Sequence, residues 1–267
     1  MTTLPDQTSR SLPLRVKRAT FGLLPRRFRL PVRVLWMRAT RSLEPEVNEM
    51  ARLVPPGGTA VDIGANHGVY SYFMVRHFDT VVAFEPQPAC VETLDGWARQ
   101  RVVIRPVALS DHEGESTLSI PVAHGVVMTG YARLDAGAEV AGAATLDVPV
   151  ERLDDQGLTD VRFIKIDVEG HELEVLRGGE QLLRRDEPVL LVEIEQRHLG
   201  DTRTVAEVIE YLNGLGYGAY FRIDGSGWVD VSRFDPSQHQ DVGAVGTRDY
   251  VSMFLFTPGG RQPSVAG

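Results

Sequence analysis

The sequence predicts an α/β protein built on one large, mostly parallel sheet. A short apolar run at residues 60–63 and a second one at residues 81–84 are typical of buried parallel strands. Between them lie a turn bounded by glycines and an amphipathic helix pattern, which together predict a βαβ unit. Further mainly apolar strand patterns at residues 163–167 and 189–194 alternate with helical patterns and extend the same arrangement.

The order of the elements predicts how the sheet is connected. Expected helices cover residues 45–53, 70–78, 88–99, 173–183 and 205–215, and expected strands cover residues 60–63, 81–84, 102–109, 116–120, 146–150, 163–167, 189–194, 219–223 and 251–256. The last two strands have no long helix between them, so a closing hairpin should place one antiparallel strand in the sheet. This layout is that of the class I methyltransferase (Rossmann-like) fold, a seven-stranded, mostly parallel sheet with one antiparallel strand and helices on both faces.

The composition fits one globular domain preceded by a basic segment. The chain has 267 residues, 43% of them hydrophobic and 24% charged, which is enough for a large core. Its net charge is −8, yet residues 1–41 contain ten of the 28 basic side chains and only one of the 36 acidic ones. We expect a basic N-terminal arm and helical segment over residues 1–54, the α/β domain over residues 55–258, and a disordered tail over residues 259–267.

The basic arm has more than one interpretation. Apolar side chains, Leu35 and Trp36 among them, are interleaved with the arginines, which would suit a helix lying on a membrane surface. Pro25 and Pro31 are expected to interrupt any long helix in this segment. The interpretation that we favour is a basic layer that packs on the acidic body or closes over its pocket. The acidic main body argues against a nucleic-acid groove.

Other compositional features concern the location of the protein and one loop. The single cysteine, Cys90, cannot form an internal disulfide and is expected to be a small buried side chain in a helix. No apolar stretch approaches the ~20 residues that cross a bilayer, and the N-terminus has no compact apolar core of a secretory signal. We therefore expect a cytoplasmic protein. Residues 135–144, mostly Ala and Gly, predict a surface loop or lid.

The turn after the first strand predicts a cofactor that contains adenosine. Gly64 and Gly68 bound this turn, and Glu85 ends the second strand about 20 residues further on, where nucleoside-binding folds place a carboxylate for the ribose hydroxyls. Asn66 stands where a pyrophosphate-binding loop has its middle glycine. S-adenosyl-L-methionine has no phosphate and is therefore favoured. Asp62 and Asn66 could contact its zwitterionic end, because the ammonium group needs an acceptor.

Several blocks of the sequence resemble one known family. VDIGANHGVYS at residues 61–71, AFEPQP at residues 83–88, VALSD at residues 107–111 and FIKIDVEGHE at residues 163–172 are similar to blocks of the FkbM family of S-adenosylmethionine-dependent methyltransferases and follow in the same order. Shorter matches extend the resemblance, which covers about residues 55–200. The resemblance implies methyl transfer to a hydroxyl of a sugar, glycolipid, polysaccharide or polyketide-type metabolite.

Positions near the strand ends suggest further contacts with this cofactor. Glu85 would accept hydrogen bonds from both ribose hydroxyls, and Ser110 and Asp111, at the end of the third strand, would flank the adenine. Tyr70 and Ser71 begin the helix after the glycine turn and could touch the methionine carboxylate.

Catalysis by this chemistry calls for a general base. An alcohol is a poor nucleophile until its proton is removed, and the candidates lie just after the fourth strand. His171 is the first choice because an ordinary histidine titrates near neutral pH. Asp167 and Glu169 could position the methionine ammonium or the acceptor hydroxyl. Asp167 and Glu193 could in principle ligate Mg²⁺, but carboxylates at strand ends are common without metals, and we assign no metal site.

Two other functions stay open on the sequence alone. One is a nucleotide-dependent oxidoreductase, against which Asn66 and the closing pair of strands argue. The other is a non-catalytic cofactor-binding scaffold that regulates a partner through the basic arm. Four acids at the expected site argue against it, namely Asp62, Glu85, Asp167 and Glu169. We expect a small-molecule or glycan acceptor and no nucleic acid. Peripheral membrane contact through the basic arm remains the alternative to packing of the arm on the acidic body. The sequence does not predict an oligomeric state.

Overall fold

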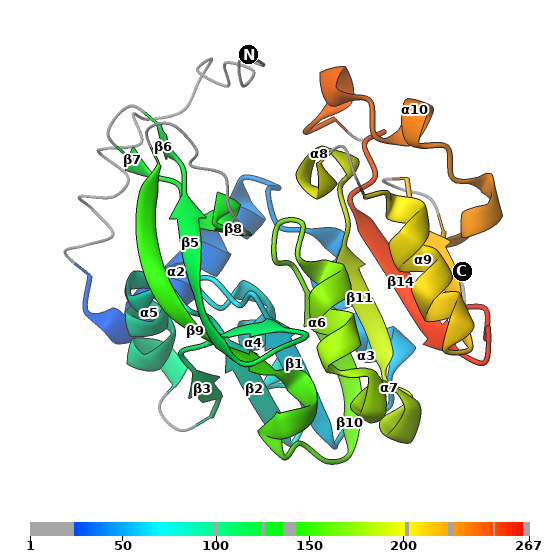
Figure 1. The fold of residues 1–267 in the computed structure, drawn as a ribbon. Helices are drawn as coiled ribbons and strands as arrows, with labels where there is room; N and C mark the ends of the chain where they lie inside the picture. Colours follow the sequence, from blue (N-terminus) through cyan, green and yellow to red (C-terminus); the bar gives the residue numbers. More distant parts are fainter. Residues whose placement is uncertain are drawn as a thin grey trace.

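A large sheet of eight strands runs through the centre of the molecule, with a smaller sheet beside it (Figure 1). The computed structural model describes residues 24–98, 101–123, 126–135, 143–200, 203–223, 227–247 and 249–263. The predictions for residues 1–23 and for most of the loop at 135–144 therefore lie outside the described residues.

The topology of the large sheet confirms the predicted class I methyltransferase fold. Its strand order is β13–β12–β14–β11–β10–β1–β2–β3. The strands are β1 (Thr59–Ile63), β2 (Thr80–Phe84), β3 (Val103–Arg105), β10 (Val161–Ile166), β11 (Val189–Glu193), β12 (Tyr217–Phe221), β13 (Val229–Asp230) and β14 (Met253–Pro258). Strand β1 pairs in parallel with β2 and β10, whereas β14 runs antiparallel to β11 and β12. The two-residue edge strand β13 is an eighth strand, too short to show any periodicity in the sequence.

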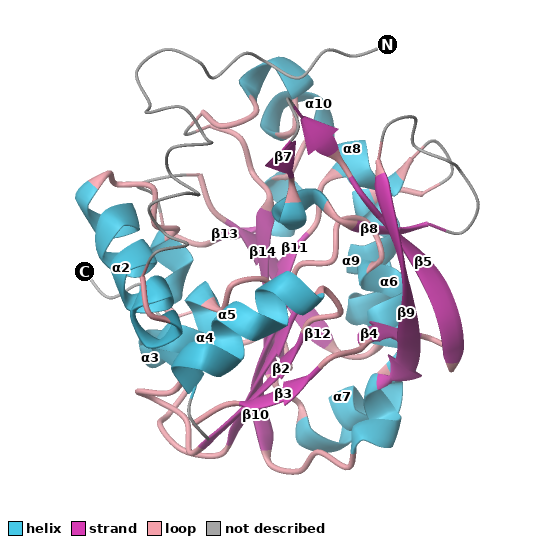
Figure 2. Ribbon diagram, turned by 90° about the vertical axis from the view of Figure 1, so that its left-hand side faces the viewer, coloured by secondary structure: helices cyan, strands magenta, loops and turns pink. Residues whose placement is uncertain are grey.

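Helices cover both faces of this sheet. They are α2 (Arg26–Ala39), α3 (Met50–Leu53), α4 (Val69–Met74), α5 (Pro88–Ala98), α6 (Glu172–Gly178), α7 (Glu180–Asp186), α8 (Gln196–Leu199), α9 (Val205–Gly214) and α10 (Pro236–His239), with short 3₁₀ turns η1 (Pro45–Asn48), η2 (Thr129–Tyr131), η3 (Leu153–Gln156), η4 (Val231–Arg233) and η5 (Val242–Ala244). Helices α2, α4 and α5 lie on one face, and α6, α7 and α9 lie on the other (Figure 2). In β1, Ala60 packs with the first group and Val61 with the second, which explains why the strand is apolar throughout.

The predicted third strand region divides between two sheets. Strand β3 belongs to the large sheet, whereas β4 (Ala108–Ser110) pairs with β9 (Ala144–Arg152) in a smaller sheet. Pro106 lies between β3 and β4, and its lack of an N–H group explains why one ladder ends there. The smaller sheet also holds β5 (Gly114–Ile120) and β8 (Arg133–Asp135), and β6 (Val122–Ala123) pairs with β7 (Val126–Val127).

Helix α2 runs through Pro31, so the prediction that this proline interrupts the helix is wrong. A proline in a helix removes one backbone hydrogen bond, here the one to the carbonyl of Arg27. Leu30 and Val34 flank Pro31 and are buried against the layer of α4 and α5, and this burial offsets the lost bond. Pro25 immediately precedes the helix, at its N-cap.

The predicted disordered tail is wrong in its first part. The backbone N–H of Gly259 donates to the carbonyl of Gly216 over 2.9 Å. The Tyr220 hydroxyl donates to the carbonyl of Gly260, also over 2.9 Å. These bonds hold the start of the tail against β12, and residues 264–267 lie outside the described residues.

Close contact between α6 and β4 joins the two sheets. A Cβ atom on Gly178, at the end of α6, would stand 1.9 Å from the carbonyl oxygen of Ser110 in β4. We expect Gly178→Ala to lower the free energy of unfolding by about 1–3 kcal/mol, because backbone must move to admit the methyl group. Gly214→Ala is the control, since a Cβ there would meet nothing within 4 Å. It should be neutral or stabilising by up to ~1 kcal/mol. Urea denaturation measures both, and equal effects would contradict the close contact.

Candidate active site

A cavity lies at the carboxyl ends of the central strands, where ligands bind in open α/β sheets. Its lining comes from the turn after β1, the end of β2, the segment that leads into β4, the region of η2 and β8, and the loop after β10. Residues from both sheets therefore enclose it. Of the predicted site residues, Gly64, Asn66, Glu85, Asp167 and Glu169 belong to the lining.

The turn after β1 packs backbone against backbone with the loop after β10. Gly64 and Gly68 have φ angles of 74° and 86°, in the left-handed region that favours glycine. A Cβ atom on Gly64 would stand 1.9 Å from the carbonyl oxygen of Asp167. Asn66 also has a positive φ, 48°, which asparagine tolerates better than most residues. The turn can therefore lie flat against the neighbouring loop and form one side of the cavity.

Glu85 is a buried carboxylate at the cavity wall. Its side chain is 2% exposed, Oε2 accepts a hydrogen bond from the Asn66 N–H over 2.7 Å, and Oε1 accepts one from the Gln87 N–H over 2.8 Å. Burial raises the pKa of Glu85 to about 7, although these two hydrogen bonds act in the opposite direction. Each oxygen is used once by the backbone and can accept another bond, so the group can receive two hydroxyls.

Asp62, Tyr70 and Ser71 lie behind the cavity wall. Oδ2 of Asp62 accepts hydrogen bonds from the N–H and the hydroxyl of Ser71, over 2.9 and 2.6 Å. Oδ1 of Asp62 is buried and has no hydrogen-bond partner within the described structure. The Tyr70 hydroxyl donates to Glu44 over 2.5 Å. The contact predicted between Tyr70 or Ser71 and a methionine carboxylate is therefore not seen; these side chains fix the start of α4 instead.

A single buried lysine stands among four carboxyl groups next to the cavity. Lys165 is 2% exposed, and its Nζ lies 2.7 Å from Oδ2 of Asp167. Burial alone would lower the pKa of Lys165, but Asp167, Asp62, Glu193 and Glu44 raise it above its usual value. Burial in turn raises the pKa values of Asp62, Glu44 and Glu193. The positive charge of Lys165 lowers these pKa values, but by less than burial raises them. The group has more acids than bases, so it favours a cationic ligand beside Asp167.

The structure does not bring Ser110, Asp111 or His171 to the cavity. Ser110 is fully buried, and its hydroxyl lies 2.8 Å from Nε2 of His171. Asp111 lies 2.9 Å from Nδ1 of His112 at the surface. Residues 107–109 line the cavity in their place. The reason is the change of sheet after β3, because it turns the end of β4 toward α6.

His171 is also poorly suited to accept a proton from an acceptor. Its Nε2 faces Ser110, and its Nδ1 lies 3.7 Å from a Glu174 carboxylate oxygen. Burial lowers the pKa of His171. The predicted role of His171 as general base therefore has no support from its position.

Glu169 faces the cavity and is held by a histidine that the sequence analysis missed. Nδ1 of His198, in α8, lies 2.6 Å from Oε2 of Glu169. Glu169 has a φ of 55°, unusual for a residue with a side chain, and Gly170 follows with a φ of 100°. A Cβ atom on Gly170 would stand 2.3 Å from the carbonyl oxygen of His198, so the loop after β10 and α8 touch closely. Only one feature of the sequence pointed to His198. It follows β11, which is parallel to β10, so it lies near the edge of the sheet at which β10 ends.

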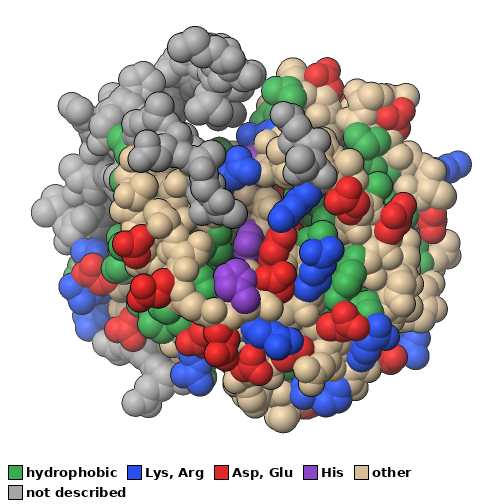
Figure 3. Space-filling model, in the orientation of Figure 1, with side chains coloured by type: hydrophobic (Ala, Val, Ile, Leu, Met, Phe, Trp, Pro, Cys, Tyr) green, Lys and Arg blue, Asp and Glu red, His purple; other side chains and the backbone are tan. Residues whose placement is uncertain are grey.

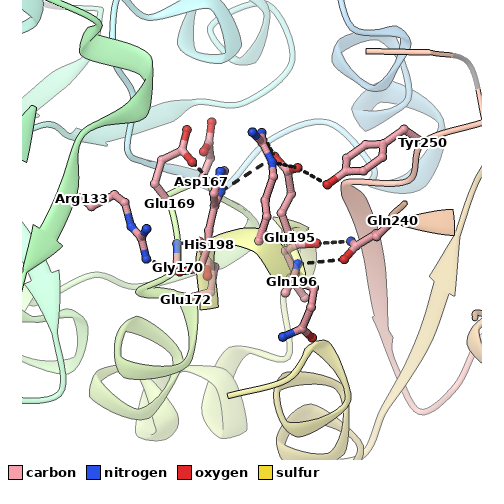
Figure 4. A network of polar contacts seen from close by, with 12 residues as sticks. Arg133, Asp167, Glu169, Gly170, Glu172, Glu195, Gln196, His198, Gln240 and Tyr250 are labelled. Carbon is pink, nitrogen blue, oxygen red and sulfur yellow. Dashed lines mark hydrogen bonds and ion pairs between the residues drawn. The ribbon is translucent and has the colours of Figure 1, made fainter. Parts of the chain in front are cut away.

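Further polar contacts hold His198 in place (Figure 4). The guanidinium of Arg133, in β8, donates to the carbonyl of His198. Nδ1 of His198 also lies 3.9 Å from Glu195, which pairs with Arg197 and accepts a hydrogen bond from the Tyr250 hydroxyl over 2.5 Å. The network joins the loop after β10, α8, the smaller sheet and the segment before β14. The side chain of Glu169 is thus positioned from several elements.

The turn η2 covers the cavity from the side of the smaller sheet. The side-chain amide of Gln87 donates to the carbonyl of Thr129 over 3.0 Å. A Cβ atom on Gly130 would lie 3.3 Å from the amide nitrogen of Asn66. The two contacts join segments more than 40 residues apart, so no local sequence pattern predicts them.

Two kinds of feature are absent from the part of the chain that the structure describes. It contains no group of three or more His, Cys, Asp or Glu side chains that could hold a metal ion. None of its helices has the length and apolar character to span a membrane.

Comparison with known families then places the chain. Residues 62–218 match the family described as the methyltransferase FkbM domain. This chain belongs to the FkbM methyltransferase family. The match begins at Asp62 and includes the glycine turn, Glu85 and the whole loop after β10.

Individual relatives share less of their length with the chain. Methyltransferase sdnD of Sordaria araneosa is 30% identical over an alignment 162 residues long, which covers 48% of this chain and 62% of the relative. Methyltransferase 1 of Beauveria bassiana is 28% identical over an alignment 150 residues long, which covers 46% of this chain and 59% of the relative. The chain thus spans about three fifths of the length of these two relatives.

Two of the solved structures that match the chain share little sequence with it. The crystal structure of methyltransferase FkbM from Methylobacillus flagellatus has a TM-score of 0.46 and 16% identity, covering 90% of this chain and 59% of that one. An rRNA methylase from Streptococcus thermophilus has a TM-score of 0.45 and 12% identity, covering 80% of this chain and 93% of that one.

The buried acid Glu172 should make the stability of the protein depend on pH. Its Oε1 accepts the Gly170 N–H over 2.9 Å, its Oε2 has no partner among the described residues, and burial raises its pKa from 4.5 to about 7. Between these values the folded state keeps a proton that the unfolded state has lost. The free energy of unfolding should therefore fall as pH rises through this window and level off above it, by up to about 3 kcal/mol for this group.

Glu172→Gln should remove the part of the pH dependence of stability that Glu172 causes. The part that Glu85 causes should remain, because its pKa is also raised to about 7. Glu210→Gln, on the exposed side of α9, is the control and should keep the wild-type profile. Urea denaturation across the window measures the three profiles. A Glu172→Gln profile as steep as that of the wild type would contradict the assignment.

Proposed function

We propose that this protein is an S-adenosyl-L-methionine-dependent O-methyltransferase. The proposed acceptor is a hydroxyl of a sugar, glycolipid, polysaccharide or polyketide-type metabolite. The observation that carries the proposal is the buried carboxylate of Glu85, which lines the cavity at the end of β2 and can still accept two hydrogen bonds. Membership of the FkbM family supports the same reaction class.

The residues around the cavity fit this cofactor in three parts. Glu85 would receive the two ribose hydroxyls, and the apolar stretch at residues 107–109 would lie against the adenine. Asp167, with the unpartnered Oδ1 of Asp62 behind it, would attract the methionine ammonium. Asn66 would lie along the amino-acid end. When bound, the cofactor supplies a methyl group on a positively charged sulfur.

In the proposed mechanism, Glu169 accepts the proton of the acceptor hydroxyl. It lines the cavity two residues after Asp167, and His198 fixes the direction of its carboxylate. Burial raises the pKa of Glu169, which makes it a stronger base near neutral pH than an exposed glutamate. The bond between Nδ1 of His198 and Oε2 leaves the other oxygen of Glu169 to meet the hydroxyl. Asp167, paired with Lys165, remains a binding group.

A small-molecule or glycan acceptor also agrees with the surface. Among the described residues on the face shown in Figure 3, acidic and basic side chains are interspersed and form no continuous basic groove of the kind that follows a nucleic-acid backbone. Peripheral contact with a membrane through the N-terminal segment is part of the proposal, and the cytoplasmic location stays a prediction.

The proposal is tested by incubating the protein with methyl-labelled S-adenosyl-L-methionine and a panel of hydroxylated glycans, glycolipids and polyketides. Mass spectrometry should find products that gain one methyl group. Calorimetry should show binding of S-adenosyl-L-methionine and none of NAD. Binding of NAD alone would support an oxidoreductase, and cofactor binding without any product would support a scaffold.

Glu85→Gln should weaken binding of S-adenosylhomocysteine by about 10–100-fold, because the hydroxyls lose a charged acceptor. In the wild type, affinity should rise with pH up to about pH 7, by as much as tenfold per unit, because the ionised Glu85 is the better acceptor. The variant should lose this dependence. Isothermal titration calorimetry at several pH values measures both effects, and a pH-dependent variant would exclude Glu85 as their source.

Glu169→Gln should lower kcat by about 100-fold or more, with the affinity for S-adenosylhomocysteine nearly unchanged. His198→Ala should lower kcat less and shift its pH profile, because Glu169 loses its hydrogen-bond partner. His171→Gln is the control and should keep kcat within a few-fold of the wild type. Rates are measured with an acceptor from the panel. A greater loss in His171→Gln than in Glu169→Gln would return the role of base to His171.

A further inference from the structure

Helix α2 has a buried side and an exposed side, and both are apolar. Leu30 and Val34 are 0% and 2% exposed and pack with the layer of α4 and α5. Helix α2 packs chiefly on α5, where Arg26 forms an ion pair with Glu92. The helix is thus firmly attached to the body of the protein by one side only.

The exposed side of α2 carries large apolar side chains. Phe28, Val32, Leu35 and Trp36 are 44%, 37%, 67% and 42% exposed. Their spacing of four, seven and eight residues from Phe28 places them on one side of a helix, opposite Leu30. Half of the eight large apolar side chains that are exposed in the described residues lie on this one helix. We call the four residues the α2 outer face.

Arginines border the α2 outer face, and acids are absent from it. Helical periodicity places Arg27 and Arg38 along one edge and Arg29 along the other. Residues 24–43 contain no Asp or Glu. Figure 2 shows α2 at the outer margin of the molecule, with α5 and α4 on its inner side. A partner that approaches α2 from outside therefore meets an apolar strip between two basic edges.

We propose that the α2 outer face docks the protein on an anionic membrane surface. Aromatic and aliphatic side chains of such a face enter the boundary between headgroups and acyl chains, and arginines at its edges pair with lipid phosphates. Charge complementarity selects this occupant. The remainder of the chain is strongly acidic, so the basic edges of α2 offer local attraction where the body as a whole would be repelled. This inference rests on the membrane contact named in the proposed function and assigns it to specific residues, but it does not depend on the proposed methyl transfer.

The inference is tested with the full chain and lipid vesicles. Vesicles of phosphatidylcholine alone are compared with vesicles that contain about 30% phosphatidylserine, in a sedimentation assay. The wild type should partition at least about tenfold more strongly onto the anionic vesicles, and added salt should reduce the difference. Absence of binding to anionic vesicles would overturn the proposal.

Substitutions then locate the contact. Leu35→Asp, at the most exposed position of the α2 outer face, should reduce binding to anionic vesicles by about tenfold or more. Val242→Asp is the matched control, since Val242 is 53% exposed in η5 and lies outside α2, and it should bind as the wild type does. Equal binding by Leu35→Asp and the wild type would overturn the proposal.

Two further measurements separate folding and self-association from lipid binding. Circular dichroism and binding of S-adenosylhomocysteine should be unchanged in Leu35→Asp, so loss of vesicle binding cannot come from misfolding. Light scattering without lipid reports the oligomeric state. A dimer that Leu35→Asp dissociates, together with no vesicle binding by the wild type, would assign the face to a second copy and overturn the membrane proposal.

Discussion

The candidate site depends on the close approach of two backbone segments at Gly64 and Asp167. Because Gly64 has no side chain, the turn after β1 lies against the carbonyl of Asp167. The N–H groups of Gly64 and Ala65 donate to the carbonyl of Phe84, over 3.0 and 3.1 Å, so the same turn is tied to β2. These contacts bring the ends of β1, β2 and β10 together. Glu85 and Asp167, which come from different strands, thereby line one cavity.

Burial of charge is the second constraint. The carboxyl groups near Lys165 outnumber it, and burial raises the pKa of most of them. Ionised carboxylates in such an excess are destabilised by burial and by one another, and a bound cation would stabilise them. The ammonium of an amino-acid ligand would supply that charge. Ligand binding at Asp167 would then stabilise the folded protein, because the ammonium group neutralises negative charge that Lys165 alone does not neutralise.

Local sequence patterns were sufficient for the fold and for the position of Glu85 at the end of β2, whereas its role in cofactor binding stays a prediction. The apolar runs of β1 and β2 and the glycines between them belong to one continuous stretch, so their relative position follows from the βαβ unit. Ser110 and His171 were misplaced for a tertiary reason. The chain leaves the large sheet at the end of β3, and α6 packs on β4. No local pattern encodes either feature. His198 was missed because its contact with Glu169 depends on the path of the chain after β11.

Tertiary packing also explains why the prediction for α2 was wrong. Pro31 predicted a break in the helix, but the burial of Leu30 and Val34 keeps the helix continuous. Its inner side reaches the site, since a Cβ atom on Gly68 would stand 3.3 Å from a methyl carbon of Leu30. Gly68 immediately precedes α4. The second residue of α4 is Tyr70, whose hydroxyl donates to Glu44, one of the four carboxyl groups around Lys165. The α2 outer face is therefore one helix away from the turn that shapes the cavity. A membrane bound to the α2 outer face would lie on the side of the molecule where α2 covers α4 and α5. Glu169, Arg133 and His198 lie toward the smaller sheet and α8. Docking and acceptor access would thus use different elements, and neither would obstruct the other.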